Sequence, residues 1–167
     1  MIGLKYPFTQ EEFKQAADEW GCNCGPSSLA FALQSPLDRA RSQIPGFDEK
    51  RYTSPAMMRQ ALDRLAVAFN DVQPPSVDEM WDMRRYSLVR IQWAGPWTEP
   101  GANPKWAYRQ THWIATTPLS LLDHSIFDCN AGIVSWDLWT MMTVPFILKH
   151  VPRANGKWWP THIWRLP

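Results

Sequence analysis

The stretch EWGCNCGPSSLAFAL, from Glu19 to Leu33, places two cysteines one residue apart, directly before a Gly-Pro pair and an apolar run. Because the first-turn amides of a helix have no intrahelical acceptor, Pro26 is tolerated there, and a helix is predicted to begin at Asn23 or Cys24. Three explanations of the cysteines are open. They are two metal ligands, two small buried residues, or a nucleophile at the start of a helix, and each requires different companions elsewhere in the chain.

The overall composition narrows this choice. The chain has 167 residues, 45% of them hydrophobic, which is enough for one domain with a sizeable core, so we expect a single domain over residues 1–167. The 17 Lys and Arg against 16 Asp and Glu give a net charge of +1, which offers no electrostatic basis for binding nucleic acid or an anionic membrane. We therefore expect neither nucleic acid nor a membrane among its partners.

The sequence also bears on the compartment. The N-terminal MIGLKYPFTQEEFKQ lacks the apolar core of a signal peptide, and no window approaches the roughly 18 apolar residues of a membrane span. The 3 cysteines suit a reducing compartment better than a disulfide framework. We expect a cytoplasmic protein. Its 11 Trp often adjoin polar or turn residues, which suggests amphipathic groove walls beside ordinary core packing.

Helix signals fill the first half of the chain. Thr9, followed three residues later by Glu12, is a capping box, and the helix that it opens should stop by Gly21. Further helix starts are predicted after Ser35-Pro36, at Ser54-Pro55, and at the capping box of Ser76 and Glu79.

In the second half the apolar period changes from helical to twofold. Strands are predicted at 87–93, 110–117, 124–128 and 132–136, with 161–166 as a candidate fifth. The apolar stretch 137–150 should be partly helical, with a break or kink at Pro145. A helical part over about 9–84 and a mostly antiparallel sheet over about 87–167 make the fold class α+β.

Cys24 is the candidate nucleophile. A thiol at the start of a helix meets the positive end of the helix dipole and unpaired amides, and both favour the thiolate. Cys22 lies one or two residues too early for this, and Gly25 is expected to leave room above the sulfur for a substrate carbonyl. Burial is common for free cysteines, so Cys22 and Cys129 are interpreted as structural residues.

His112 and Asp128 are the candidate base and orienting acid, because a thiolate needs an imidazole that a carboxylate or amide holds in place. Asn130 shares a strand face with Asp128, so alternation alone does not choose between them. Asn is favoured in turns, and a turn is expected directly after this strand, so Asn130 fits a turn position. Asp is disfavoured inside strands, so Asp128 is expected to have a specific partner. We therefore predict an Asp128 oxygen within about 2.6 to 3.2 Å of a His112 ring nitrogen, with the Cys24 sulfur near the other nitrogen.

Two alternatives compete with this assignment, another histidine as the base and a zinc site. Among the other histidines, His124 should lie at a loop edge and His150 at the end of the irregular apolar segment, and His162 is the real rival on its candidate strand. Zinc could be held by three thiolates and one imidazole, from Cys22, Cys24, Cys129 and His112. The Cys-x-Cys spacing is tighter than zinc sites usually have, so no metal or other cofactor is predicted.

The motifs NCGPSSLAFAL, THWIATT and IFDCNAG, in this order, resemble papain-like cysteine peptidases, especially the compact bacterial branch that includes bacteriocin-processing peptidase domains. They are also similar to small bacteriophage proteins of this type. The resemblance implies a helical lobe packed on a β lobe, with Cys24, His112 and Asp128 as nucleophile, base and orienting acid. Such peptidases usually carry a Gln about six residues before the nucleophile, whose amide helps to bind the oxyanion. Here that position is Asp18, which leaves Gln15, Trp20 and Asn23 as candidate donors.

We therefore expect a cysteine-dependent peptidase, amidase or acyl transferase that works through a thioester. Its expected partner is a peptide or amide substrate, with a host or phage protein as one candidate. The alternative is a papain-like fold that has lost activity and serves as a binding module, which Asp18 favours and the Cys-His-Asp set opposes.

Overall fold

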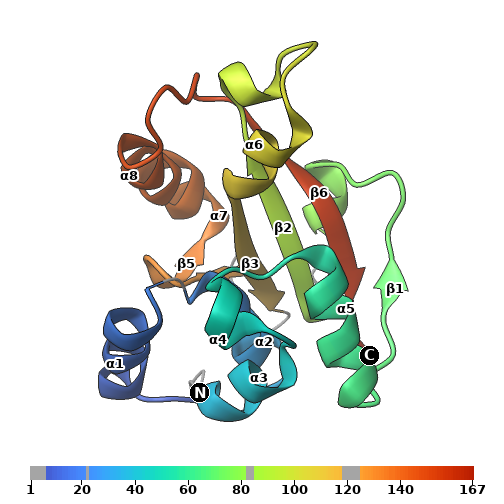
Figure 1. Cartoon of the computed structure of the whole chain (residues 1–167). Coiled ribbons are helices and arrows are strands. Elements are labelled where there is room, and N and C mark those ends of the chain that lie inside the picture. The colour runs from blue at the N-terminus through green and yellow to red at the C-terminus, as the bar shows by residue number, and fades with distance from the viewer. Residues whose placement is uncertain (1–6, 22, 82–84, 118–124) are drawn as a thin grey trace.

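The structure is a computed structural model that describes residues 7–21, 23–81, 85–117 and 125–167 (Figure 1). Met1 to Tyr6, Cys22 and His124 lie outside the described residues. An N-terminal helical region packs against a C-terminal six-stranded antiparallel sheet, which confirms the predicted α+β class.

Five helices make up the N-terminal region, and their ends follow the predicted signals. Thr9 Oγ1 accepts a hydrogen bond from Glu12 N, and Glu12 Oε2 accepts one from Thr9 N, so the predicted capping box opens the first helix. Ser54 Oγ caps the fifth helix through Met57 N, with Pro55 in its first turn. The helices are α1 (Gln10–Trp20), α2 (Cys24–Ala32), α3 (Leu37–Gln43), α4 (Phe47–Lys50) and α5 (Pro55–Arg64).

The sheet has the strand order β1-β6-β2-β3-β4-β5, and every neighbouring pair is antiparallel. The five predicted strands are confirmed to within a few residues, while the two-residue β1 was not predicted. The strands are β1 (Asn70–Asp71), β2 (Ser87–Trp93), β3 (Thr111–Thr117), β4 (Ser125–Asp128), β5 (Gly132–Ser135) and β6 (Trp158–Arg165).

In the described residues, three α-helices, two 3₁₀ turns (Asp78–Trp81 and Pro96–Thr98) and a π-helical turn lie between the strands of the sheet. The helix α6 (Pro104–Arg109) joins β2 to β3 and was not predicted. Between β5 and β6 run α7 (Trp136–Leu138), the π-helical turn Trp139–Thr143 and α8 (Val144–Lys149). Pro145 therefore does not end the helical stretch. It sits in the first turn of α8, where the chain changes from π to α geometry and the missing amide donor costs little.

Both faces of the sheet are buried, because successive residues of a strand point to opposite sides. Leu88, Trp113 and Phe127 point toward α1 to α5 and join what we call the helix-face core, with Leu29, Phe31, Met58 and Leu62. Val89, Ile114 and Ile126 belong to what we call the opposite-face core, with Trp139 and Val144 from the π turn and α8. In Figure 1 the blue α1 and α2 lie in the lower part of the molecule, and the orange α7 and α8 lie above them beside β5.

The helix α2 is the element that links the helical region to the sheet. Its residues from Gly25 to Ala32 are all buried, and it packs on β3 and also contacts β2 and β4. Burial of this kind requires the small, uncharged sequence CGPSSLAFA. The helix that begins at Cys24 thereby packs on β3 and β4, the strands that carry His112 and Asp128.

Candidate functional site

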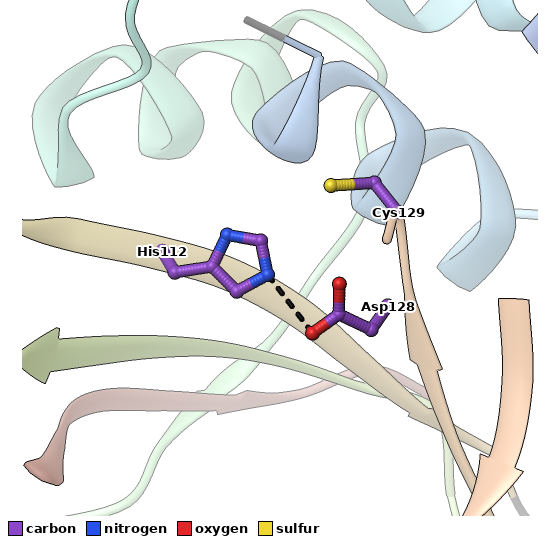
Figure 2. Close-up of side chains that lie close together, drawn as sticks. All are labelled: His112, Asp128 and Cys129. Atoms are coloured by element: carbon purple, nitrogen blue, oxygen red, sulfur yellow. Dashed lines mark hydrogen bonds and ion pairs between the residues drawn. The ribbon is translucent and has the colours of Figure 1, made fainter. Parts of the chain in front are cut away.

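His112 and Asp128 form a buried pair at the ends of two neighbouring strands. His112 is the second residue of β3 and Asp128 is the last residue of β4. The His112 Nε2 lies 3.0 Å from Asp128 Oδ2, and the two residues are 7% and 0% exposed (Figure 2). This distance confirms the prediction that Asp128 contacts the His112 ring.

The Asp128 carboxylate is held on both oxygens. Besides His112, Oδ2 accepts a hydrogen bond of 2.8 Å from Trp139 Nε1, while Oδ1 accepts bonds of 2.8 and 3.0 Å from Asn130 N and Nδ2. Burial alone would raise the pKa of Asp128, but the His112 charge and these hydrogen bonds outweigh it and lower the pKa to about 2. Asp128 is therefore ionised, and its position fixes the orientation of the imidazole.

Asn130 supports Asp128 rather than taking its place. It lies in the turn between β4 and β5, where its main-chain and side-chain N–H groups both bond Asp128 Oδ1. Such local bonding by Asn in turns is the role that the sequence predicted for it. Two tryptophan rings also contact the His112–Asp128 pair. Trp93 stacks on the His112 ring with centroids 6.1 Å apart, and Trp139, a residue of the opposite-face core, donates a hydrogen bond to Asp128.

Cys24 is the first residue of α2 and is half-buried against the helix-face core. The helix α2 contacts both β3 and β4, the strands that carry His112 and Asp128. That the Cys24 sulfur lies near the second ring nitrogen stays a prediction. One expectation about its neighbour is wrong: the space that a side chain at Gly25 would fill is already taken by Thr53, whose Oγ1 would lie 2.1 Å from an added Cβ. Gly25 thus serves close packing of α2 on the loop before α5.

Cys129 lies at the site, although its sequence position suggested a structural role. Ligand atoms of His112, Asp128 and Cys129 all lie within 4.8 Å of one another, and Figure 2 shows the Cys129 sulfur directed toward the His112 ring. Strand alternation would send Cys129 to the other side from Asp128. That rule fails because β4 ends at Asp128 and Cys129 already belongs to the turn. The half-buried Cys129 also lines an open cleft of about 860 Å³ beside the start of α1.

The other described histidines have different surroundings. The His162 Nδ1 lies 3.1 Å from Thr161 Oγ1, its ring packs edge-on against Trp164, and burial, followed by the charge of Arg90, lowers its pKa. His150 is exposed after α8, with its ring against Phe146. Among the described histidines only His112 has an ion-pair contact with a carboxylate.

The three candidate oxyanion donors differ in availability. The Gln15 amide donates a 2.7 Å hydrogen bond to Glu19 on the exposed side of α1, which occupies the group that an oxyanion role would need. Trp20 is buried among the helices, against Phe47 and under Arg41, and its Nε1 has no partner among the described residues. Asn23 is 9% exposed, does not cap α2, and its Nδ2 is likewise unpaired within the described part of the chain. Asn23 is therefore the donor best placed beside Cys24.

His112, Asp128 and Cys129 are also the side chains that could hold a metal ion. Thiolate and imidazole suit zinc, but both Asp128 oxygens already accept two N–H donors each. A metal bound by Asp128 would have to displace these bonds. The alternative zinc set includes Cys22, which lies outside the described residues.

No protein-family model and no curated protein matches the chain. In the part of the chain that the structure describes, no helix is long and apolar enough to cross a membrane.

Proposed function

We propose that this chain is a cysteine-dependent hydrolase or acyl transferase with a papain-like arrangement, in which Cys24 is the nucleophile, His112 the base and Asp128 the orienting acid. The observation that carries the proposal is the buried contact of 3.0 Å between His112 Nε2 and Asp128 Oδ2, on two strands that contact the buried helix beginning with Cys24. A carboxylate that is fully buried and ionised next to an imidazole is a costly arrangement, which catalysis would explain.

The proposed reaction begins with attack of the Cys24 thiolate on a substrate carbonyl carbon, which forms a tetrahedral oxyanion. The N–H groups at the start of α2 and the Asn23 side chain are the proposed donors to this oxyanion. Protonated His112 then gives its proton to the leaving amine as the C–N bond breaks, and a thioester remains on Cys24. Neutral His112 next removes a proton from water or an acceptor amine, whose attack releases Cys24.

A peptide, isopeptide or related amide is the proposed substrate class, because this chemistry needs an acyl carbon with a leaving amine. A host or phage protein fits this class. The net charge of +1 argues against nucleic acid as the substrate, and a cytoplasmic location is proposed on the same grounds as above.

The rival proposal is a papain-like binding module without activity. Asp18 favours it, because an anion six residues before Cys24 cannot replace the amide donor of the family. The retained pair of His112 and Asp128 opposes it, because a binding module has no need of a buried imidazole and carboxylate.

The deciding experiment uses the activated ester 4-nitrophenyl acetate, whose acetyl group can be followed by mass spectrometry. We expect a burst of nitrophenolate and a single acetyl group on the peptide that contains Cys24. The burst should be lost in Cys24→Ser and kept in Cys129→Ser, which makes the same exchange at the neighbouring thiol. Acetylation of Cys129 instead, or of both thiols equally, would overturn the assignment of the nucleophile.

Iodoacetamide gives an independent readout that needs no substrate. Cys24 should be alkylated at least about tenfold faster than Cys129, with a rate that titrates below about pH 8. Slow and equal alkylation of the two thiols in the folded protein would favour the binding module.

A further inference from the structure

Arg90 is a buried cation that the proposed mechanism does not yet use. It lies in the middle of β2 and is 4% exposed. Its neighbours Val89 and Ile91 belong to the opposite-face core, and Leu88 belongs to the helix-face core. By strand alternation the Arg90 side chain is therefore on the face that α2 covers.

The contacts of Arg90 hold its guanidinium in one place. Its Cζ lies 4.8 Å from the centroid of the Tyr108 ring, and its Nη1 donates a 3.1 Å hydrogen bond to Thr161 Oγ1. Arg90 pairs with His162 and Ile91 with Pro160, so Thr161 is the extra residue of a β-bulge. Bulges re-aim side chains and are common beside active sites.

No carboxylate balances this charge among the described residues. Arg90 takes part in none of their ion pairs, and its buried Nε has no hydrogen-bond partner there. A buried charge is costly unless an anion or several hydrogen bonds compensate for it. The charge of Arg90 is therefore balanced by no carboxylate in the described part of the chain, so an anion of another kind would stabilise it.

A chain of contacts leads from Arg90 to the start of α2. Trp113 is the cross-strand neighbour of Arg90, and its Nε1 donates a 2.8 Å hydrogen bond to the Thr53 carbonyl. The Thr53 side chain in turn fills the space beside Gly25, the residue that follows Cys24. Burial lowers the pKa of Arg90, while the negative charges of Tyr108 and Cys24 act in the opposite direction, as expected if Cys24 lies near Arg90.

We propose that Arg90 is a positioning residue for Cys24, acting as the fixed counter-cation of its thiolate. This inference rests on the proposed role of Cys24 as the nucleophile. Arginine suits this task because its guanidinium stays protonated throughout the working pH range, whereas the imidazole of His112 loses its charge. With Arg90 in place, the Cys24 thiolate that attacks the substrate, and that leaves again when the thioester is cleaved, faces a cation whose charge does not change over this pH range.

The test follows alkylation of Cys24 by iodoacetamide from pH 5 to pH 10 with site-specific mass spectrometry. In this reaction the thiolate carbon–sulfur bond forms as the carbon–iodine bond breaks and iodide leaves. In Arg90→Gln we expect the pH midpoint to rise by about one unit and the rate near pH 6 to fall about tenfold. The plateau at high pH should not change, and Arg90→Lys, which keeps the charge, should recover most of the shift.

The matched control is Arg59→Gln. Arg59 also covers aromatic rings, those of Phe69 and Trp164, but it is half exposed and already paired with Asp71. This exchange removes the same charge from the chain and should leave the midpoint for Cys24 in place. Other ionisable groups around the site are His112, Asp128, Cys129, Tyr108, His162 and Arg51, and none of them is altered in these variants. An unchanged midpoint in folded Arg90→Gln would overturn the proposal, and so would a control that shifts the midpoint equally.

A second measurement needs no variant at all and so does not depend on the folding of Arg90→Gln. Anionic iodoacetate and neutral iodoacetamide both react with the thiolate. The ratio of their alkylation rates at one pH is therefore independent of the fraction of thiol that is ionised. A cation near the sulfur favours the anionic reagent, so the ratio should be several-fold higher at Cys24 than at Cys129, which lies beside His112 but on the turn after β4. Equal ratios would refute the role of Arg90. Neither readout requires turnover, so an inactive protein with a low midpoint would overturn the proposed function and leave Arg90 as the counter-cation.

Discussion

At the scale of single residues, Asp128 is the group on which the site depends most. Its two oxygens accept four hydrogen bonds from N–H groups of His112, Trp139 and Asn130, and it has no solvent exposure. In Asp128→Asn one oxygen becomes an NH₂ group, which must face two of these N–H donors. We expect the free energy of unfolding to fall by about 3 kcal/mol, measured by denaturant titration.

The matched control for this loss is Asp63→Asn. Asp63 is exposed on α5, so the same chemical change there should cost less than about 0.5 kcal/mol. A loss of that small size in Asp128→Asn would contradict the hydrogen-bond network described for the carboxylate.

The same carboxylate predicts how stability depends on pH. Its pKa falls from 3.8 in the unfolded chain to about 2 in the folded protein, so the stabilisation is complete above about pH 4 and is lost as the pH falls through about 2. At about 1.4 kcal/mol per pKa unit, the full effect is about 2 to 3 kcal/mol. The stability gap between wild type and Asp128→Asn should therefore narrow by about 1 kcal/mol at pH 3 and further toward pH 2. If the difference in free energy of unfolding between wild type and Asp128→Asn stayed constant over this range, the contacts of Asp128 would not lower its pKa.

At the scale of elements, the packing of α2 depends on the absence of a side chain at position 25. An added Cβ would lie 2.1 Å from Thr53 Oγ1 and 2.5 Å from Thr53 Cβ, and the short β-branched Thr cannot swing aside. We expect Gly25→Ala to destabilise the protein by about 1 to 3 kcal/mol and to displace the start of α2. Removing the Thr53 side chain should relieve the overlap, so Gly25→Ala with Thr53→Gly should be more stable than the sum of the two single changes implies. Strict additivity would show that the two residues are not in contact.

Elements whose signals are local were predictable from the sequence. The capping box of Thr9 and Glu12, the cap at Ser54, and the alternation of 87–93 each depend on residues a few positions apart. The strand β1 has two residues and is defined by its pairing with β6, so no local pattern marks it. The helix α6 does carry a local signal, because Asn103 caps it before Pro104, but its Trp-rich surroundings were interpreted as groove walls instead.

The candidate site was predictable only in part, where local sequence signals identify its residues. The turn preference of Asn130 and the low strand propensity of Asp together identified Asp128 as the partner of His112. Trp139 and Arg90 could not be found in this way, because their positions follow from the order of the strands and from the packing of α2 and the π turn. Cys129 was misjudged because its interpretation relied on the general burial of free cysteines, whereas its side chain lies in the turn after β4, where strand alternation no longer sets its direction.

At the scale of the whole molecule, the two cores share the same strands. Adjacent residues of β2 serve different cores, as Leu88 and Val89 do, and β2 lies between β6 and β3 in the sheet. If β2 left the sheet, apolar residues of both cores would be exposed to solvent. The site lies where the two cores meet, since Cys24 packs on the helix-face core and Trp139, which bonds Asp128, belongs to the opposite-face core.

This sharing predicts one cooperative unfolding transition for residues 1–167. Leu62→Ala truncates the helix-face core and should lower the free energy of unfolding by about 2 to 5 kcal/mol, and Val144→Ala should lower it less in the opposite-face core. Because tryptophans occupy both cores, fluorescence reports both, and its transition should coincide with that of far-UV circular dichroism in each variant. If either substitution instead split the curve into two transitions, the cores would be separate folding units. In that case, unfolding of the opposite-face core, which contains Val144 and Trp139, would break the hydrogen bond from Trp139 to Asp128 without exposing Cys24. The alkylation rate of Cys24 in Val144→Ala would then stay at the wild-type value.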